Sequence, residues 1–158
     1  RLLNEAMNIV RETRGERYWE VGYYLDALGN LYWKSGQTRE AQPHIRSAIE
    51  IFSETLPADH LYIASSLQTL GEIYIAQGNL VAAEKPLRDA IAICTKSTGP
   101  ASWRTARSEN TLGTVLIQMG REEEGKALLT TSYQALRTPL GDEDELTKLA
   151  RQRLAALN

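Results

Sequence analysis

The sequence predicts an all-α protein, an α-solenoid built from antiparallel helical hairpins. Three observations lead to this fold class. The 158-residue chain repeats itself every 42 residues, apolar residues within each unit recur at helical spacing, and no alternation of apolar and polar residues indicates a strand. With 42% hydrophobic and 24% charged residues, the composition is that of a folded domain. The length is sufficient to bury a core without disulfides or structural metal.

The 42-residue period is carried by several positions at once. Leucine recurs at 28, 70, 112 and 154, and glycine follows the first three of these leucines. Further matching sets are Tyr32, Tyr74 and Leu116; Gly36, Gly78 and Gly120; Ala41, Ala83 and Gly125; Ile45, Leu87 and Leu129; and Ala48, Ala90 and Ser132. Chance does not produce so many matches at one spacing, so the repeat is a property of the fold.

The period divides the chain into a single repeat array. We expect full units over residues 16–57, 58–99 and 100–141. Residues 1–15 correspond to the second helix of a truncated unit, and residues 142–158 to a partial unit or capping helix. Because the sequence starts inside a unit, at Arg1, we expect it to be a fragment of a larger protein.

The apolar spacing predicts the first helix of each unit over residues 21–32, 61–75 and 106–117. Each of these helices should end at a glycine in a left-handed cap, namely Gly36, Gly78 or Gly120.

The second helix of each unit should begin directly after that glycine. Thr38 or Asn79 can supply a capping side-chain oxygen, whereas Arg121 in the third unit caps poorly. These helices should end near Pro57, Gly99 and Gly141, and Pro86 should kink the second of them.

A glycine lies within each predicted first helix, at positions 29, 71 and 113. Glycine in mid-helix costs about 1 kcal/mol relative to alanine, so its recurrence indicates that two helices approach closely there. We expect these glycines to face Ala48, Ala90 and Ser132 of the second helices.

The arrangement of Leu28-Gly29, Tyr32, Gly36, Ala41 and Ala48 resembles the tetratricopeptide repeat. The usual unit of that family has about 34 residues, and the extra residues here fall between Ala48 and Leu70. The longer unit, with Pro-Ala-Asp-His at 57–60, resembles the kinesin-light-chain type. HEAT and armadillo units run to about 40 to 47 residues but lack this register.

The resemblance covers essentially the whole chain and implies a right-handed superhelix. In this family the first helices line a concave groove that binds extended peptides or partner helices. The last unit also resembles the C-terminal ends of bacterial multidomain proteins in which such repeats follow a protein kinase or another effector domain. This second resemblance implies that the parent chain is a bacterial signalling protein.

Composition argues against several kinds of partner. Eighteen basic and twenty acidic residues with a pI near 5.8 give no basic footprint, so we expect no nucleic acid partner. No apolar stretch is long enough to span a bilayer and no secretion signal precedes the repeats, so we expect a cytoplasmic protein with no membrane partner.

No residue pattern indicates an enzyme, a metal site or a cofactor. His60 is expected to cap a helix, and Cys94 shares its repeat position with Val10, Phe52 and Leu136 and is expected in the core. Residues 29–35 end like a phosphate loop but lack its second glycine and lie in mid-helix.

The candidate peptide-binding residues lie beside the core stripe on the first helices. They are Tyr23, Asp26, Asn30, Trp33, Gln68, Glu72, Ile75, Arg107, Asn110 and Thr114. The row formed by Asp26, Gln68 and Asn110 is rich in amides, which both donate to and accept from a peptide backbone. The resemblance implies that Asn110 corresponds to the backbone contact of the family, from which Gln68 and Asp26 depart.

Alternatives exist at each step. A solvated helix face would explain any one candidate residue, and Trp33, Ile75 and Ile117 could pack between units instead of anchoring a ligand. The aromatic residues between 18 and 33 could form a binding hot spot or pack on upstream repeats. We predict a protein-interaction module that binds a peptide or helical segment, the alternative being a structural spacer or self-association through the truncated ends.

Overall fold

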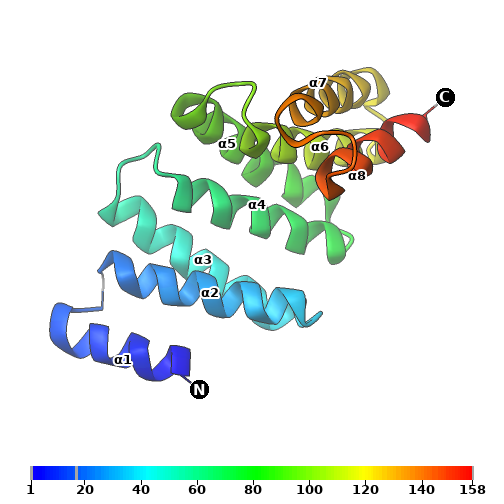
Figure 1. Ribbon diagram of the computed structural model, residues 1–158. Coiled ribbons are helices and arrows are strands. Elements are labelled where there is room, and N and C mark those ends of the chain that lie inside the picture. The colour runs from blue at the N-terminus through cyan, green and yellow to red at the C-terminus, as the bar shows by residue number, and fades with distance from the viewer. Residues whose placement is uncertain (1, 17, 158) are drawn as a thin grey trace.

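The computed structural model describes residues 2–16 and 18–157, which form eight helices and no strand (Figure 1). The helices are α1 (Leu2–Arg14), α2 (Trp19–Lys34), α3 (Thr38–Thr55), α4 (Leu61–Ala76), α5 (Leu80–Thr98), α6 (Trp103–Gln118), α7 (Glu122–Leu140) and α8 (Glu145–Ala155). No helix in these ranges combines the length and apolar character needed to span a bilayer.

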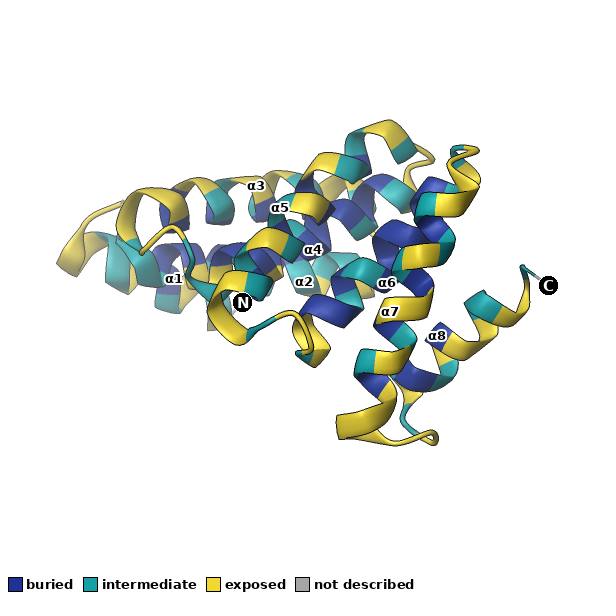
Figure 2. Ribbon diagram, turned by 90° about the horizontal axis from the view of Figure 1, so that it is seen from above, coloured by how far each residue is buried: buried dark blue, intermediate teal, exposed yellow. Residues whose placement is uncertain are grey.

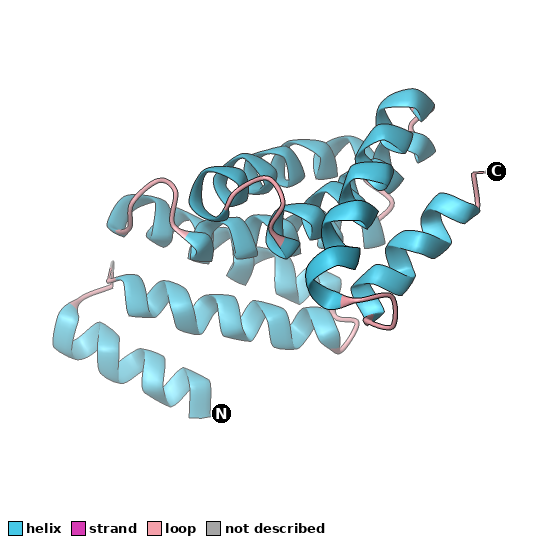
Figure 3. Cartoon of the chain, turned by 45° about the horizontal axis from the view of Figure 1, so that its top comes forward, coloured by secondary structure: helices cyan, strands magenta, loops and turns pink. Residues whose placement is uncertain are grey.

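The helices stack in chain order from α1 at one end to α8 at the other (Figure 1; Figure 3). The most extensive contacts join α2 to α3, α4 to α5 and α6 to α7, so these pairs are the hairpins. The first helices of successive hairpins also touch, α2 with α4, α4 with α6 and α6 with α8. We call the side on which these four helices adjoin the first-helix face. The all-α solenoid is thereby confirmed.

The predicted glycine caps are present. Gly36, Gly78 and Gly120 have φ of 80°, 74° and 82°. The amide that follows each glycine donates to a carbonyl five residues back, as Asn79 does to Tyr74 at 2.9 Å. Helix α6 starts earlier than predicted, at Trp103, because the Ser102 hydroxyl accepts a bond from the Thr105 amide and caps it.

The observed N-caps of the second helices agree with the sequence prediction at two positions and differ from it at one. The Asn79 side chain accepts from the Ala82 amide at 3.1 Å, and Arg121 makes no side-chain cap. The prediction for Thr38 was wrong, because the repeat equates Asn79 with Gln37, which makes no side-chain cap. His60 caps α4 as expected. Helix α5 continues past Pro86 to Thr98, and a kink there stays a prediction.

The helical glycines mark close helix contacts, but their partners are not the expected ones. A Cβ at Gly29 would lie 2.6 Å from the Ile45 side chain, and one at Gly71 would lie 2.7 Å from Leu87. The expected partners Ala48, Ala90 and Ser132 were therefore wrong. Residues of a hairpin pair symmetrically about the N-cap residue of its second helix, Gln37 or Asn79, so that the glycine eight residues before this position meets the residue eight after it.

Gly71→Ala should destabilise the protein by about 1 to 3 kcal/mol, because the new methyl group overpacks against Leu87. Urea unfolding measures this loss. A second substitution, Leu87→Ala, removes the clashing atoms, so the double variant should be more stable than the sum of the two single effects. Strict additivity would contradict the close contact.

Buried residues lie where the helices of a hairpin face each other and where adjacent hairpins meet (Figure 2). Cys94 is buried as predicted, and burial raises the pKa of its thiol. Tyr32 lies at the edge of the core, although the repeat equates it with Tyr74. Its ring is half-buried because it lies flat against His44 at the core edge, with ring centroids 5.5 Å apart, whereas the equivalent Tyr74 is buried.

Glu109 is a carboxylate at a position that is apolar in the two preceding units, where Leu25 and Leu67 stand. Both leucines pack in the core cluster of the first hairpins. The Glu109 Oε2 atom is buried without a hydrogen-bond partner among the described residues. Burial raises the pKa of this carboxyl group from 4.5 to about 7.

The protein should therefore lose stability as the pH rises from about 4.5 to 7. Below this window Glu109 is protonated in both the folded and the unfolded state. Within it the unfolded state ionises first, which favours unfolding, and above it the penalty is constant. Because Glu109 is only half-buried, we expect a loss of only about 1 to 2 kcal/mol. Thermal unfolding of the Glu109→Leu variant should lack this pH dependence, and an unchanged profile would contradict it.

Candidate peptide-binding groove

Hydrogen bonds between neighbouring first helices run along the first-helix face. Between α2 and α4, the Ser66 hydroxyl donates to the Asp26 carboxylate at 2.5 Å. The Thr69 hydroxyl donates to the Asn30 amide oxygen at 3.2 Å, and the Asn30 amide nitrogen donates to Asp26 at 2.9 Å. Burial raises the pKa of Asp26, although the bonds from Ser66 and Asn30 act in the opposite direction.

The same kind of contact joins α4 to α6 and α6 to α8. Gln68 donates its amide to the Thr111 hydroxyl at 3.1 Å and to the Glu72 carboxylate at 2.8 Å. Arg153 donates its guanidinium to the amide oxygen of Asn110. Gln68 and Asn110 lie one repeat apart, as do Thr111 and Arg153, so one contact recurs with arginine in place of threonine. We call these helix-to-helix bonds the polar seam.

The polar seam occupies the amide row predicted to bind a peptide backbone. Gln68 and Asn110 are each 4% exposed. The Asn110 amide nitrogen donates to Ser132 at 3.2 Å while its oxygen accepts from Arg153. Both amides therefore hold neighbouring helices together, and their contact with a ligand backbone stays a prediction.

Half of the candidate residues gather around one pocket of 260 Å³ on the first-helix face, which we call the groove pocket. The candidates that line it are Trp33, Glu72, Ile75, Arg107 and Asn110. Its other lining residues are Ala76, Thr111, Leu136, Leu146, Leu149 and Arg153. The candidate list lacked the α8 residues, although the 42-residue period could have revealed Arg153 as the counterpart of Thr111.

Three charged side chains share the groove pocket with its apolar wall. Arg107 forms an ion pair with Glu72 at 2.9 Å. Burial lowers the pKa of Arg153, while the Glu72 charge acts in the opposite direction. Two guanidinium groups and one carboxylate give the pocket a net positive charge. The apolar wall beside them is suited to an apolar side chain.

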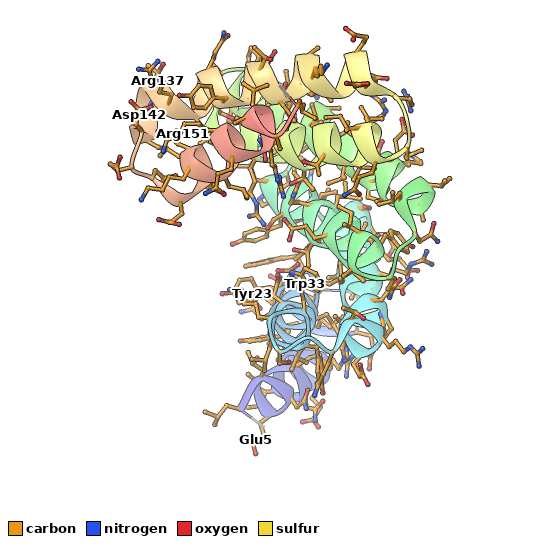
Figure 4. All side chains as sticks on the ribbon, turned by 90° about the vertical axis from the view of Figure 1, so that its right-hand side faces the viewer. Glu5, Tyr23, Trp33, Arg137, Asp142 and Arg151 are labelled. Atoms are coloured by element: carbon orange, nitrogen blue, oxygen red, sulfur yellow. The ribbon has the colours of Figure 1, made fainter. Side chains whose placement is uncertain are left out.

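The remaining candidates lie outside the groove pocket. Thr114 is half-buried and its hydroxyl donates to the Asn110 carbonyl at 3.1 Å. Tyr23 is 48% exposed and lies with Trp33 on the side of α2 that faces α4 (Figure 4). Asp26 and Asn30 belong to the polar seam.

The aromatic residues of α2 pack against the following hairpin. Tyr62 of α4 is the centre of this group, with the Trp19, Tyr23 and Phe52 rings at centroid distances of 6.4, 6.0 and 5.5 Å. Trp33 stands apart, half-buried against the core and lining the groove pocket. The described part of the chain contains no group of three or more His, Cys, Asp and Glu side chains that could hold a metal ion.

Thr111→Val should destabilise the protein by about 1 to 2 kcal/mol, because it removes the acceptor of a buried Gln68 bond without changing the side-chain volume much. Chemical unfolding provides the measurement. Thr114→Val is the matched control, since the Thr114 hydroxyl bonds only within α6. Equal effects of both substitutions would show that the seam bond contributes nothing of its own.

The fold and the first-helix face define an α-solenoid repeat domain. Residues 24–96 match the tetratricopeptide repeat family model. This stretch of the chain is therefore similar to tetratricopeptide repeats, and the fold of the chain is that of kinesin-light-chain-like repeat arrays. Proteins with this repeat are typically non-catalytic scaffolds that bind other proteins.

Solved structures with this fold share little sequence identity with the chain. A single-residue variant of kinesin-light-chain-like repeats from Podosopora anserina superposes with a TM-score of 0.80 at 22% identity, covering 99% of this chain and 74% of that one. A second structure of those repeats gives 0.77 at 21% identity, with coverages of 89% and 66%. BtubC (BKLC) from P. vanneervenii gives 0.77 at 17% identity, with coverages of 98% and 61%. No curated protein sequence matches the chain.

Proposed function

We propose that this chain is a non-catalytic interaction module that binds a peptide segment of a partner protein in its concave groove. The observation that carries the proposal is the groove pocket, where residues from α2, α4, α6, α7 and α8 meet. It combines an apolar wall with side chains that donate hydrogen bonds, as peptide-binding sites do.

The apolar wall would receive one apolar side chain of the partner. Trp33, Ile75 and Leu149 line it, and Leu149 is 39% exposed. Burying such a side chain contributes about 1.5 to 3 kcal/mol. Arg107 can donate to carbonyl or carboxylate oxygens of the partner with the nitrogen atoms that Glu72 does not use.

The wider context forms part of the same proposal. The resemblance of the last unit to C-terminal ends of bacterial multidomain proteins supports a cytoplasmic signalling protein as the parent chain. Self-association through the chain ends is the second candidate function. It is favoured by Leu2 and Ile9 on α1, which are 80% and 62% exposed at one end of the stack.

Leu149→Arg should abolish partner binding, because it places a cation in the apolar wall of the groove pocket. The natural chain and the variant would be immobilised and exposed to lysate of the source cells, and the retained proteins identified by mass spectrometry. We expect a protein that the natural chain retains and the variant loses.

Val81→Arg is the matched control, since Val81 is 74% exposed on α5 and does not line the groove pocket. It should retain the same partner. Equal retention by all three chains would exclude the groove pocket as the binding site. Light scattering of the natural chain tests the second candidate, because a monomer at high concentration would contradict self-association.

A further inference from the structure

A second, smaller hollow of 80 Å³ adjoins the groove pocket and shares Arg107 with it. It lies between the first halves of α4 and α6. The side chains that matter for its chemistry are those of Ser65, Gln68, Trp103, Arg104, Arg107 and Ser108. None of its lining residues is acidic, so the hollow is a positively charged site in a protein whose net charge is −2.

The pair of arginines is specific to the third unit. Arg104 and Arg107 lie three residues apart on α6, a spacing that places them on one face of a helix. The equivalents of Arg104 in the other first helices are Glu20, Tyr62 and Leu146, and those of Arg107 are Tyr23, Ser65 and Leu149. No other first helix therefore has a cation at either position.

Both guanidinium groups have hydrogen-bond donors to spare. Arg104 lies over the Trp103 ring, 4.4 Å from its centroid, and no carboxylate in residues 2–16 and 18–157 forms an ion pair with it. Its charge lowers the pKa of Cys94, which lines the same hollow, against the larger effect of burial. Arg107 uses one terminal nitrogen for Glu72 and keeps the others.

A residue that lines the hollow has a buried acceptor without a partner. Gln68 is 4% exposed, and its Oε1 atom makes no hydrogen bond with any described residue, although its amide nitrogen makes two. A ligand that satisfies the hollow therefore carries a donor as well as an anion. A peptide residue with an anionic side chain has both, because its backbone N–H is the donor.

The donor set favours phosphate over carboxylate. Two guanidinium groups and two serine hydroxyls surround a small space at the start of α6, where the helix dipole also favours negative charge. A phosphate monoester has three acceptor oxygens and about 1.5 to 2 negative charges at neutral pH, whereas one arginine already satisfies a carboxylate.

We propose that this hollow is a subsite for a phosphorylated serine or threonine of the segment bound in the neighbouring groove pocket. The proposal rests on the proposed peptide-binding function for the origin of the segment. Arg104 and Arg107 hold the phosphate, and Gln68 accepts the backbone N–H beside it.

The test uses N-acetyl-phosphoserine N-methylamide as the probe, titrated into the ¹⁵N-labelled chain at constant ionic strength. We expect saturable shifts of the backbone amides at 102–108 and of the Trp103 indole. The corresponding glutamate compound should bind about tenfold more weakly, and the unmodified serine compound should cause no shift. Equal affinity for the phosphoserine and glutamate compounds would overturn the assignment to phosphate.

The variant Arg104→Gln/Arg107→Gln should lose the saturable shifts. Arg39→Gln/Arg151→Gln is the control, because it removes two positive charges from exposed residues of α3 and α8 and should bind as the natural chain does. Equal loss in both variants would mean general charge attraction and would overturn the subsite. The single variant Arg104→Gln keeps the Arg107–Glu72 ion pair. It should bind the phosphoserine compound about tenfold more weakly than the natural chain does. This single variant guards against misfolding of the double variant.

The failure of the subsite is distinguishable from the failure of the groove. Leu149→Arg leaves the hollow intact and should bind phosphoserine normally. If the Leu149→Arg variant binds phosphoserine normally and also retains the partner protein, the groove function is contradicted while the subsite is supported. Absence of phosphoserine binding in a chain whose partner is lost on Leu149→Arg would overturn the subsite alone.

Discussion

The close contact between each first helix and its second helix is the constraint on which the rest of the structure depends. Gly29 and Gly71 let the helices approach until Ile45 and Leu87 touch the opposite backbone. A larger residue at either glycine would push the two axes apart. Because this distance fixes the shape of each hairpin, it also fixes how the hairpins stack and where α2, α4, α6 and α8 meet.

Local features of the fold could be predicted from the sequence, whereas contacts between helices could be predicted only in part. The glycine caps follow from residues adjacent in the chain, and so does the capping role of His60. The partner of Gly29 depends on how residues pair across the turn, which moved the contact from Ala48 to Ile45. A repeat establishes equivalent positions without stating what each position touches.

The candidate site illustrates the same limit. Trp33, Ile75 and Arg107 were predicted from the helix stripe beside the core and from the groove that the family resemblance implies, and they do line one pocket. Gln68 and Asn110 were assigned to ligand binding because amides suit a peptide backbone, but adjacent helices lie near enough to use the same groups. The chemistry of a side chain identifies the groups with which it can form hydrogen bonds. Only the spacing of the helices determines which of these groups is its partner in the folded protein.

The polar seam also determines how the array can grow. The units at 58–99 and 100–141 offer the same hydroxyl groups to the preceding helix, Ser66 and Thr69 in one and Ser108 and Thr111 in the other. A duplicated unit would keep these hydroxyls but would face different acceptors, since Asp26 and Asn30 of the first unit are replaced by Gln68 and Glu72 in the second. Lengthening this solenoid by one unit would therefore require new pairings at the added junction, just as Arg153 gives the junction with α8 a chemistry of its own.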